Sequence, residues 1–129
     1  VQELLRRLGT LPQSTSYGQL RLYRVALGSR LEQQLHCEAS LDADATTAVR
    51  EALSALPVNQ AGDLPLMDGN TLSENTGLEP GEQLGRLKSW LHRIQIEQDL
   101  ATVSEVESAL KDLDWKNGHP ADWPRVSWP

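Results

Sequence analysis

The sequence predicts an all-α protein, a small multi-helix bundle followed by an irregular tail rich in Trp and Pro. Apolar residues recur at intervals of three and four along most of the 129 residues, which is the period of an amphipathic helix. Gly and Pro residues divide this pattern into segments of helical length. The apolar content comes largely from Leu, Ala and Val, without any Phe, and this composition suits helices better than a sheet.

The helical pattern is present from the first residue. Residues 1–8 have the spacing of the middle of a helix, with no initiator methionine and no helix start signal before them. We therefore expect the chain to be an excised piece of a longer protein. Gly9 is a typical helix end, and residues 12–16 form a polar connector.

Three further helices are predicted before residue 58, over 17–27, 30–41 and about 45–56. Adjacent apolar residues in the first of them leave a strand open as an alternative. Gly28 and Pro57 end the first and the third. Their apolar faces are marked by Leu20, Tyr23 and Leu27, by Leu31, Leu35 and Ala39, and by Ala45, Val49, Leu53 and Leu56.

In the second half of the chain, the sequence predicts an apolar segment at residues 64–67, called the apolar strip below, and three more helices. A short helix over 70–75 ends at Gly77. The clearest helix has Pro80 in its first turn and runs to about Gln98. A capping box from Thr102 to Glu105 begins the last helix. The two longer helices carry apolar faces marked by Leu84, Leu87, Leu91 and Ile94, and by Val103, Val106, Leu110 and Leu113.

We expect one helical domain over residues 1–114, in which 1–63 supply body helices and 64–114 a second helical segment. Residues 115–129 contain three Trp and three Pro and predict an extended tail, whose tryptophans either dock on the core or contact a missing part of the longer protein. The net charge of −6 argues against a free-standing nucleic-acid-binding module. A single cysteine, Cys37, favours a reducing compartment, so a cytoplasmic location is expected. No apolar run reaches the roughly 18 residues of a membrane span, and no membrane partner is expected.

The residues with catalytic potential do not form a recognisable active site. Asp42 and Asp44 could hold magnesium for nucleotidyl transfer. They stand at the start of an Ala-rich helix without a Gly-rich phosphate loop upstream, so we interpret them as capping residues. The three histidines, His36, His92 and His119, lack the spacing of metal ligands, and no metal site is predicted.

One face of the clearest helix is a candidate RNA contact. Arg86, Trp90 and Arg93 are four and three residues apart and share a side, where arginine can bind phosphate and tryptophan can stack on a base. Alternatively, the arginines form ordinary surface ion pairs with Glu82 and Glu97.

Two further patterns leave alternatives open. The turn at 76–81 resembles a helix-hairpin-helix phosphate grip or is a tight connection, and Gly81 with Gly85 would let another helix pack closely.

Residues 66–113 carry an ordered set of motifs, namely DGNTL at 68–72, TGLEPGEQLGRL at 76–87, and a capped helix ending in LKDL at 110–113. This order resembles the C-terminal region of bacterial CCA-adding tRNA nucleotidyltransferases and their poly(A) polymerase relatives. Asn70 stands where that family usually has an acidic residue, and Glu82 stands where it has a second proline. The match covers about two fifths of the chain.

The resemblance implies the helical body and tail of such an enzyme, without the head that carries the active site. No family active-site residue has a matching position here. The expected role is to position the acceptor region of tRNA beside an N-terminal catalytic domain that uses Mg²⁺ and nucleoside triphosphates. The alternative is a helical interaction module without a nucleotidyltransferase role. The RNA contacts we expect are Arg86, Lys88, Trp90 and Arg93, with Arg24 and Arg50 as weaker candidates.

Overall fold

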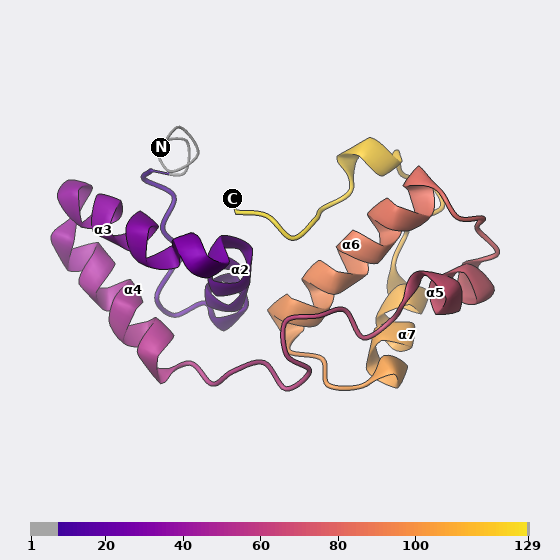
Figure 1. Cartoon of the computed structure of the whole chain (residues 1–129), viewed down its shortest axis with the longest axis horizontal. Helices are drawn as coiled ribbons and strands as arrows, with labels where there is room; N and C mark the ends of the chain where they lie inside the picture. Colours follow the sequence, from indigo (N-terminus) through magenta and orange to yellow (C-terminus); the bar gives the residue numbers. More distant parts are fainter. Residues whose placement is uncertain (1–7, 129) are drawn as a thin grey trace. The chain divides into compact units, whose positions relative to one another are not determined.

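The structure, a computed structural model, describes residues 8–128 and contains only helices as regular elements within that range (Figure 1). The predicted all-α class is confirmed. The chain divides into two compact units after Val58, where the sequence predicted a single helical domain over 1–114. We call residues 8–58 with 127–128 the N-terminal unit and residues 59–126 the C-terminal unit. The division follows from two separate buried clusters of apolar side chains, one in each unit.

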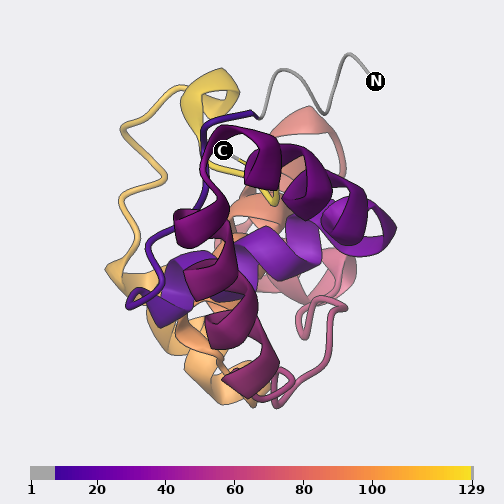
Figure 2. The same cartoon turned by 90° about the vertical axis from the view of Figure 1, so that its left-hand side faces the viewer.

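Three α-helices build the N-terminal unit: α2 (Tyr17–Leu27), α3 (Leu31–Leu41) and α4 (Ala43–Ala55). A short 3₁₀ helix, η1 (Gly28–Arg30), joins α2 to α3. Helices α3 and α4 lie side by side and α2 contacts both, as Figures 1 and 2 show from two directions. The helical alternative for 17–27 is therefore correct and the strand is not. The core cluster of buried apolar residues consists of Leu20, Tyr23, Leu27, Leu35, Val49 and Leu56, and Leu22 is buried as well.

Local chemistry fixes where α4 begins and ends. The Asp42 side chain accepts a hydrogen bond from the backbone N–H of Ala45 at 3.0 Å, which confirms its predicted capping role. At the other end, the Arg24 guanidinium donates to the carbonyl oxygens of Leu56 at 3.1 Å and Pro57 at 2.8 Å. Arg24 therefore holds the C-terminal end of α4 against α2.

Polar residues lie in the middle of this unit, where the sequence predicted only apolar ones. Gln34 and Glu38 are 0% and 2% exposed and occupy the buried face of α3, whereas Ala39 is only half-buried. Glu38 Oε1 accepts from the backbone N–H of Gly9 at 2.7 Å and from Gln34 Nε2 at 3.2 Å. Burial, together with the nearby Glu38 carboxylate, raises the pKa of the Tyr23 hydroxyl.

The chain segments on either side of the helices complete the N-terminal unit. The Trp128 indole donates to the Thr10 carbonyl at 2.8 Å. The Trp128 ring packs edge-on against Tyr23, with ring centroids 5.1 Å apart. Gly9 has the positive φ of a helix-ending glycine, 83°, but the helix predicted over 1–8 lies almost wholly outside the described residues.

The C-terminal unit contains α5 (Gly69–Thr76), α6 (Glu82–Gln98), α7 (Val103–Asp112) and the 3₁₀ helix η2 (Pro120–Asp122). Helix α6 contacts the other three. Its buried residues are Leu84, Leu87, Leu91, Gln95 and Ile96, whereas the predicted Ile94 is only half-buried. The buried apolar cluster consists of Met67, Leu72, Leu84, Leu87, Leu91, Val106, Leu110, Trp115 and Trp123.

Capping residues begin α5 and α7, and of these the sequence predicted only the one that begins α7. Asp68 Oδ1 accepts from Thr71 N at 2.8 Å, and this hydrogen bond lowers the pKa of the Asp68 carboxyl by stabilising its charged form. Thr102 Oγ1 accepts from Glu105 N at 3.3 Å in the predicted capping box.

Helix α6 begins later than predicted, at Glu82 rather than around Pro80. Gly81 precedes the helix in an extended conformation, with φ 162° and ψ −166°. Because the backbone is extended there, Pro80 lies outside the first turn. The connection from α5 instead turns at Gly77, whose φ of 77° lies in the left-handed region that favours glycine.

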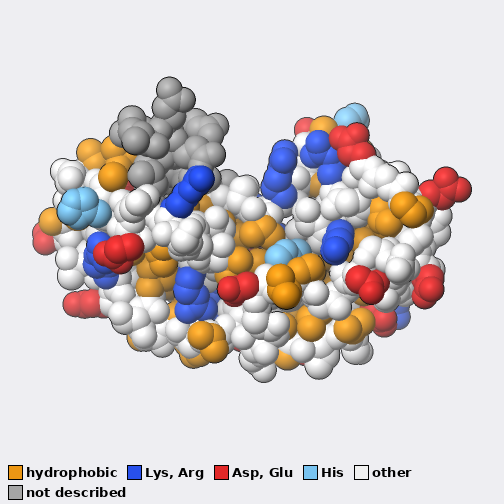
Figure 3. Space-filling model, in the orientation of Figure 1, with side chains coloured by type: hydrophobic (Ala, Val, Ile, Leu, Met, Phe, Trp, Pro, Cys, Tyr) orange, Lys and Arg blue, Asp and Glu red, His pale blue; other side chains and the backbone are white. Residues whose placement is uncertain are grey.

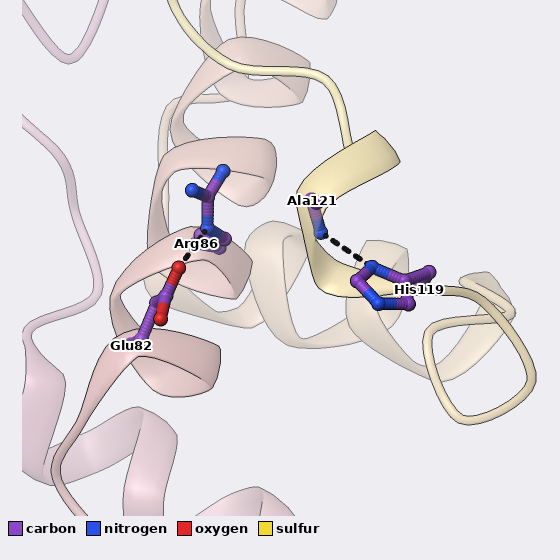
Figure 4. Close-up of polar contacts among 4 residues, drawn as sticks. All are labelled: Glu82, Arg86, His119 and Ala121. Carbon is purple, nitrogen blue, oxygen red and sulfur yellow. Dashed lines mark hydrogen bonds and ion pairs between the residues drawn. The ribbon is translucent and has the colours of Figure 1, made fainter.

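The described part of the predicted tail, residues 115–128, packs against the helices through a few residues, while more than half of it is exposed. Trp115 and Trp123 are buried in the core of the C-terminal unit. The turn η2 is capped by His119, whose Nδ1 accepts from Ala121 N at 3.2 Å (Figure 4). Across residues 8–128, no helix combines the length and the apolar character needed to cross a membrane.

A candidate anion-binding hollow on α6 and the tail

Three of the four predicted RNA contacts lie along one side of α6, and the fourth does not. Arg86, Trp90 and Arg93 follow at spacings of four and three residues. Lys88 lies two residues from Arg86, which is about 200° around a helix. It lines a small space with Met67 and Leu72, and its charge acts on Asp68. The structure therefore separates Lys88 from the other three residues.

Both arginines of this side form ion pairs within α6. Arg86 Nε contacts Glu82 Oε1 at 3.1 Å, one turn away along the helix (Figure 4). Arg93 Nε contacts Glu97 Oε1 at 2.6 Å. The surface ion pairs that the sequence offered as an alternative are thus present. Arg93 also donates from a terminal nitrogen to the Arg125 carbonyl at 3.1 Å, so it links the tail to α6.

Trp90 packs within the unit instead of projecting from it. Its ring centroid is 5.6 Å from that of Trp123, and Trp90 is half-buried against the core. Trp123 itself is buried, 6% exposed. Trp90 therefore holds the tail against α6, and this contact covers part of the ring that base stacking would need.

A hollow of about 240 Å³ lies beside the N-terminal half of α6, where the tail passes. Two guanidinium groups and one carboxylate line it, so its charged side chains sum to +1 although the whole chain carries −6. Lys and Arg side chains, with acidic ones beside them, lie over the part of this unit where α6 and the tail meet (Figure 3). Its lining residues are Glu82, Gly85, Arg86, Ser89, Trp123, Pro124 and Arg125.

Gly85 keeps one wall of the hollow open. The sequence predicted that Gly81 and Gly85 admit a closely packed helix, but a Cβ at either position would meet no atom within 4 Å in this structure. Within residues 8–128, therefore, no helix makes the close approach that these two glycines would allow. Glycine in a helix interior costs about 1 kcal/mol relative to alanine, and no contact with another described residue offsets that cost at Gly85.

Arg125 was not among the residues predicted from the sequence. It lies in a segment without helical periodicity, and its nearness to Arg86 depends on how the tail docks through Trp123 and through the Arg93 contact. The only nearby sequence feature that could have indicated Arg125 is Trp-Pro-Arg at 123–125, in which a cationic residue follows closely on a large apolar one. Spacing along the chain does not connect that cation to α6.

The remaining predicted contacts have structural partners. Arg50 pairs with Glu32 at 2.7 Å in the N-terminal unit, where Arg24 holds the end of α4. In the turn at 76–81, Leu78 is bonded through its N–H to Thr76 Oγ1 and through its carbonyl to Ser73 Oγ. These bonds favour the tight-connection interpretation. Among residues 8–128, no group of three His, Cys, Asp or Glu side chains could hold a metal ion.

Comparisons of the chain with protein-family models, with curated proteins and with solved structures found no match. Two features of the chain bear on function, namely the motif order at 66–113 and the geometry of the hollow. They overlap in part, because Glu82, Gly85 and Arg86 belong to the motif at 76–87 and also line the hollow, whereas its other wall comes from the docked tail.

Proposed function

We propose that this chain is the C-terminal, RNA-positioning part of a tRNA nucleotidyltransferase of the CCA-adding or poly(A) polymerase type. In this proposal the chain contributes no catalytic residue. Its partners are the acceptor region of tRNA and the enzyme's own N-terminal catalytic domain, which uses Mg²⁺ and nucleoside triphosphates in the cytoplasm. The motif order at 66–113 supports the family, and the hollow on α6 supports contact with RNA.

The observation that carries the proposal is the pair of arginines at one hollow, Arg86 on α6 and Arg125 on the tail. Guanidinium groups present several N–H donors in a planar fork that matches phosphate oxygens. Contacts to phosphate fix the register of a nucleic acid without reading its bases. This suits a positioning role. An enzyme that extends the 3′ end of an RNA must hold that end in place, but it does not have to read the whole base sequence.

Replacing the two arginines tests the proposal. We expect Arg86→Gln combined with Arg125→Gln to weaken tRNA binding and to flatten its salt dependence by about one to two units of slope, because fewer counterions are released. The measurement is fluorescence anisotropy of labelled tRNA with the 129-residue chain at several salt concentrations.

The matched control is Lys111→Gln with Lys116→Gln, which removes the same charge from exposed residues at a different hollow. It should change affinity much less. Equal losses in the two double variants would mean that only net charge matters and would remove the hollow from the proposal.

The second candidate function is a helical module that binds protein and does not contact nucleic acid. The net charge of −6 favours it, because a phosphate backbone repels an acidic surface. It predicts that the unaltered chain shows no salt-dependent affinity for tRNA. The same titration therefore decides between the two functions.

A further inference from the structure

We propose that Glu82 is a built-in competitor for RNA phosphate. In the unbound chain the Glu82 carboxylate pairs with Arg86. When RNA enters the hollow, a phosphate of its backbone displaces this carboxylate and pairs with Arg86 instead. The identity of the polymer rests on the proposed function. The competition itself concerns any phosphate ligand of this hollow.

The Glu82–Arg86 pair has the geometry of a contact that exchanges readily. Only Arg86 Nε contacts the carboxylate, at 3.1 Å, and within the described part of the chain the terminal nitrogens of Arg86 have no hydrogen-bond partner. The Glu82 side chain is 79% exposed, and that of Arg86 is 31% exposed. Exposed pairs of this kind contribute little to stability, so a ligand with more negative charge can displace the carboxylate.

The hollow suits a phosphate group of a polymer better than a whole nucleotide. Its volume of about 240 Å³ lies below the roughly 300–1,000 Å³ of pockets that enclose small molecules. The indole rings nearby are occupied, since Trp90 and Trp123 pack on each other. Besides the Glu82 carboxylate, the wall carries the polar groups of Arg86, Arg125 and Ser89, which can donate hydrogen bonds to phosphate oxygens.

Two neighbouring residues prepare the site. Gly85 leaves the helix surface bare, with no atom within 4 Å of the place where a Cβ would stand. Arg93 donates to the Arg125 carbonyl at 3.1 Å and so fixes the segment that carries the second guanidinium. Arg93 is a positioning residue here, because its own Nε is bonded to Glu97.

A double-mutant cycle tests the competition. We expect Glu82→Gln to raise the affinity for tRNA about two- to fivefold, the range that the energy of one exposed ion pair allows. In the Arg86→Gln background the same substitution should raise affinity by less than about half of that, because the group that Glu82 occupies is gone. The readouts are tRNA anisotropy and, separately, the change in Trp fluorescence or NMR shifts on adding inorganic pyrophosphate.

The outcomes separate the two proposals. An equal gain in both backgrounds, or no gain, overturns the competition. If tRNA affinity still depends on Arg86 and Arg125, the proposed function then stands alone. If tRNA does not bind but pyrophosphate binds with the Glu82–Arg86 coupling, the competition stands and the RNA function falls. If neither ligand binds the unaltered chain, both proposals are overturned.

Gly85→Ala gives a second arm that does not depend on charge. The methyl group would enter the hollow and lower phosphate affinity, while helix propensity would keep or raise the unfolding temperature. Gly69→Ala is the matched control, since Gly69 is also helical and an added Cβ there would meet no atom within 4 Å. It should leave affinity unchanged. Unchanged affinity in Gly85→Ala would exclude a phosphate seated beside that residue.

Discussion

Gly118 lies where the Trp123 indole leaves no room for a side chain. A Cβ at this position would stand 2.9 Å from Trp123 Nε1. Trp123 is packed against Trp90 and the core, so its ring cannot withdraw without disturbing both. We expect Gly118→Ala to lower the free energy of unfolding by about 1–3 kcal/mol, the range found for overpacked sites. Urea unfolding followed by Trp fluorescence measures this change.

Gly69→Ala serves as the control for this substitution as well, because it adds the same methyl group at a site where no atom lies within 4 Å. Its urea midpoint should stay the same or rise. If Gly118→Ala leaves the midpoint unchanged, the tail accommodates the methyl group by moving, and Trp123 is less firmly held than its burial indicates.

Single residues were predictable from the sequence where their partners are close along the chain. Asp42 and Thr102 cap their helices through N–H groups three residues away, so local spacing is enough to predict them. Glu38 and Arg125 were missed because their contacts depend on residues about thirty positions away. Local periodicity carries no information about such partners.

Among the elements, the apolar strip at residues 64–67 depends on a single side chain of α6. Gln95, 3% exposed, accepts from Leu66 N at 2.8 Å and donates to the Leu64 carbonyl at 2.9 Å. Its amide thus bonds to two backbone groups of a segment that bends at residues 64, 66 and 67 and forms no regular strand. We expect Gln95→Leu to destabilise the protein by about 1–3 kcal/mol, because a part-buried N–H loses its partner. Urea unfolding gives the value.

Gln98→Leu makes the same chemical change on the same helix at an exposed position. Its effect should be within about 0.5 kcal/mol, as for surface substitutions in general. If the two variants unfold at the same urea concentration, the strip is held by its apolar contacts, and the Gln95 hydrogen bonds contribute nothing net.

The bounds of the helices were predictable to within a few residues, because the 3.6-residue period and the capping residues both depend on residues that are close together in the sequence. Two elements depended on more than this local information. The start of α6 moved to Glu82 because Gly81 adopts an extended conformation that Pro80 alone does not indicate. The tail docks because Trp115 and Trp123 enter the core, and a segment without periodicity does not reveal which of its apolar residues are buried.

At the scale of the whole molecule, the apolar stripes of the helices predicted that the chain buries apolar side chains. They did not predict whether these side chains form one core or two. Each stripe only requires a partner face, and α2 to α4 satisfy that requirement among themselves, as do α5 to α7 with residues of the tail. The candidate site has the same limit. Arg86 was predictable from its helix, whereas the hollow exists only because the tail is docked beside it.

The end of the chain belongs to the N-terminal unit, which leads to a prediction about where stability is lost. Trp128→Ala would remove an aromatic contact with Tyr23 and a hydrogen bond to Thr10. Each of these interactions is worth about 0.5–1.5 kcal/mol, so we expect a loss of about 1–3 kcal/mol. Native-state amide hydrogen exchange should show this loss as faster exchange in α2, α3 and α4, with much smaller changes in α6 and α7.

Trp115→Ala is the counterpart, since Trp115 is buried in the core of the C-terminal unit. It should speed exchange in α6 and α7 and leave α2 to α4 nearly unchanged. The two variants together test whether each unit keeps its own stability. Equal acceleration throughout the chain in both variants would mean that the units unfold as one, and the two cores would then be one cooperative structure despite their separate contacts.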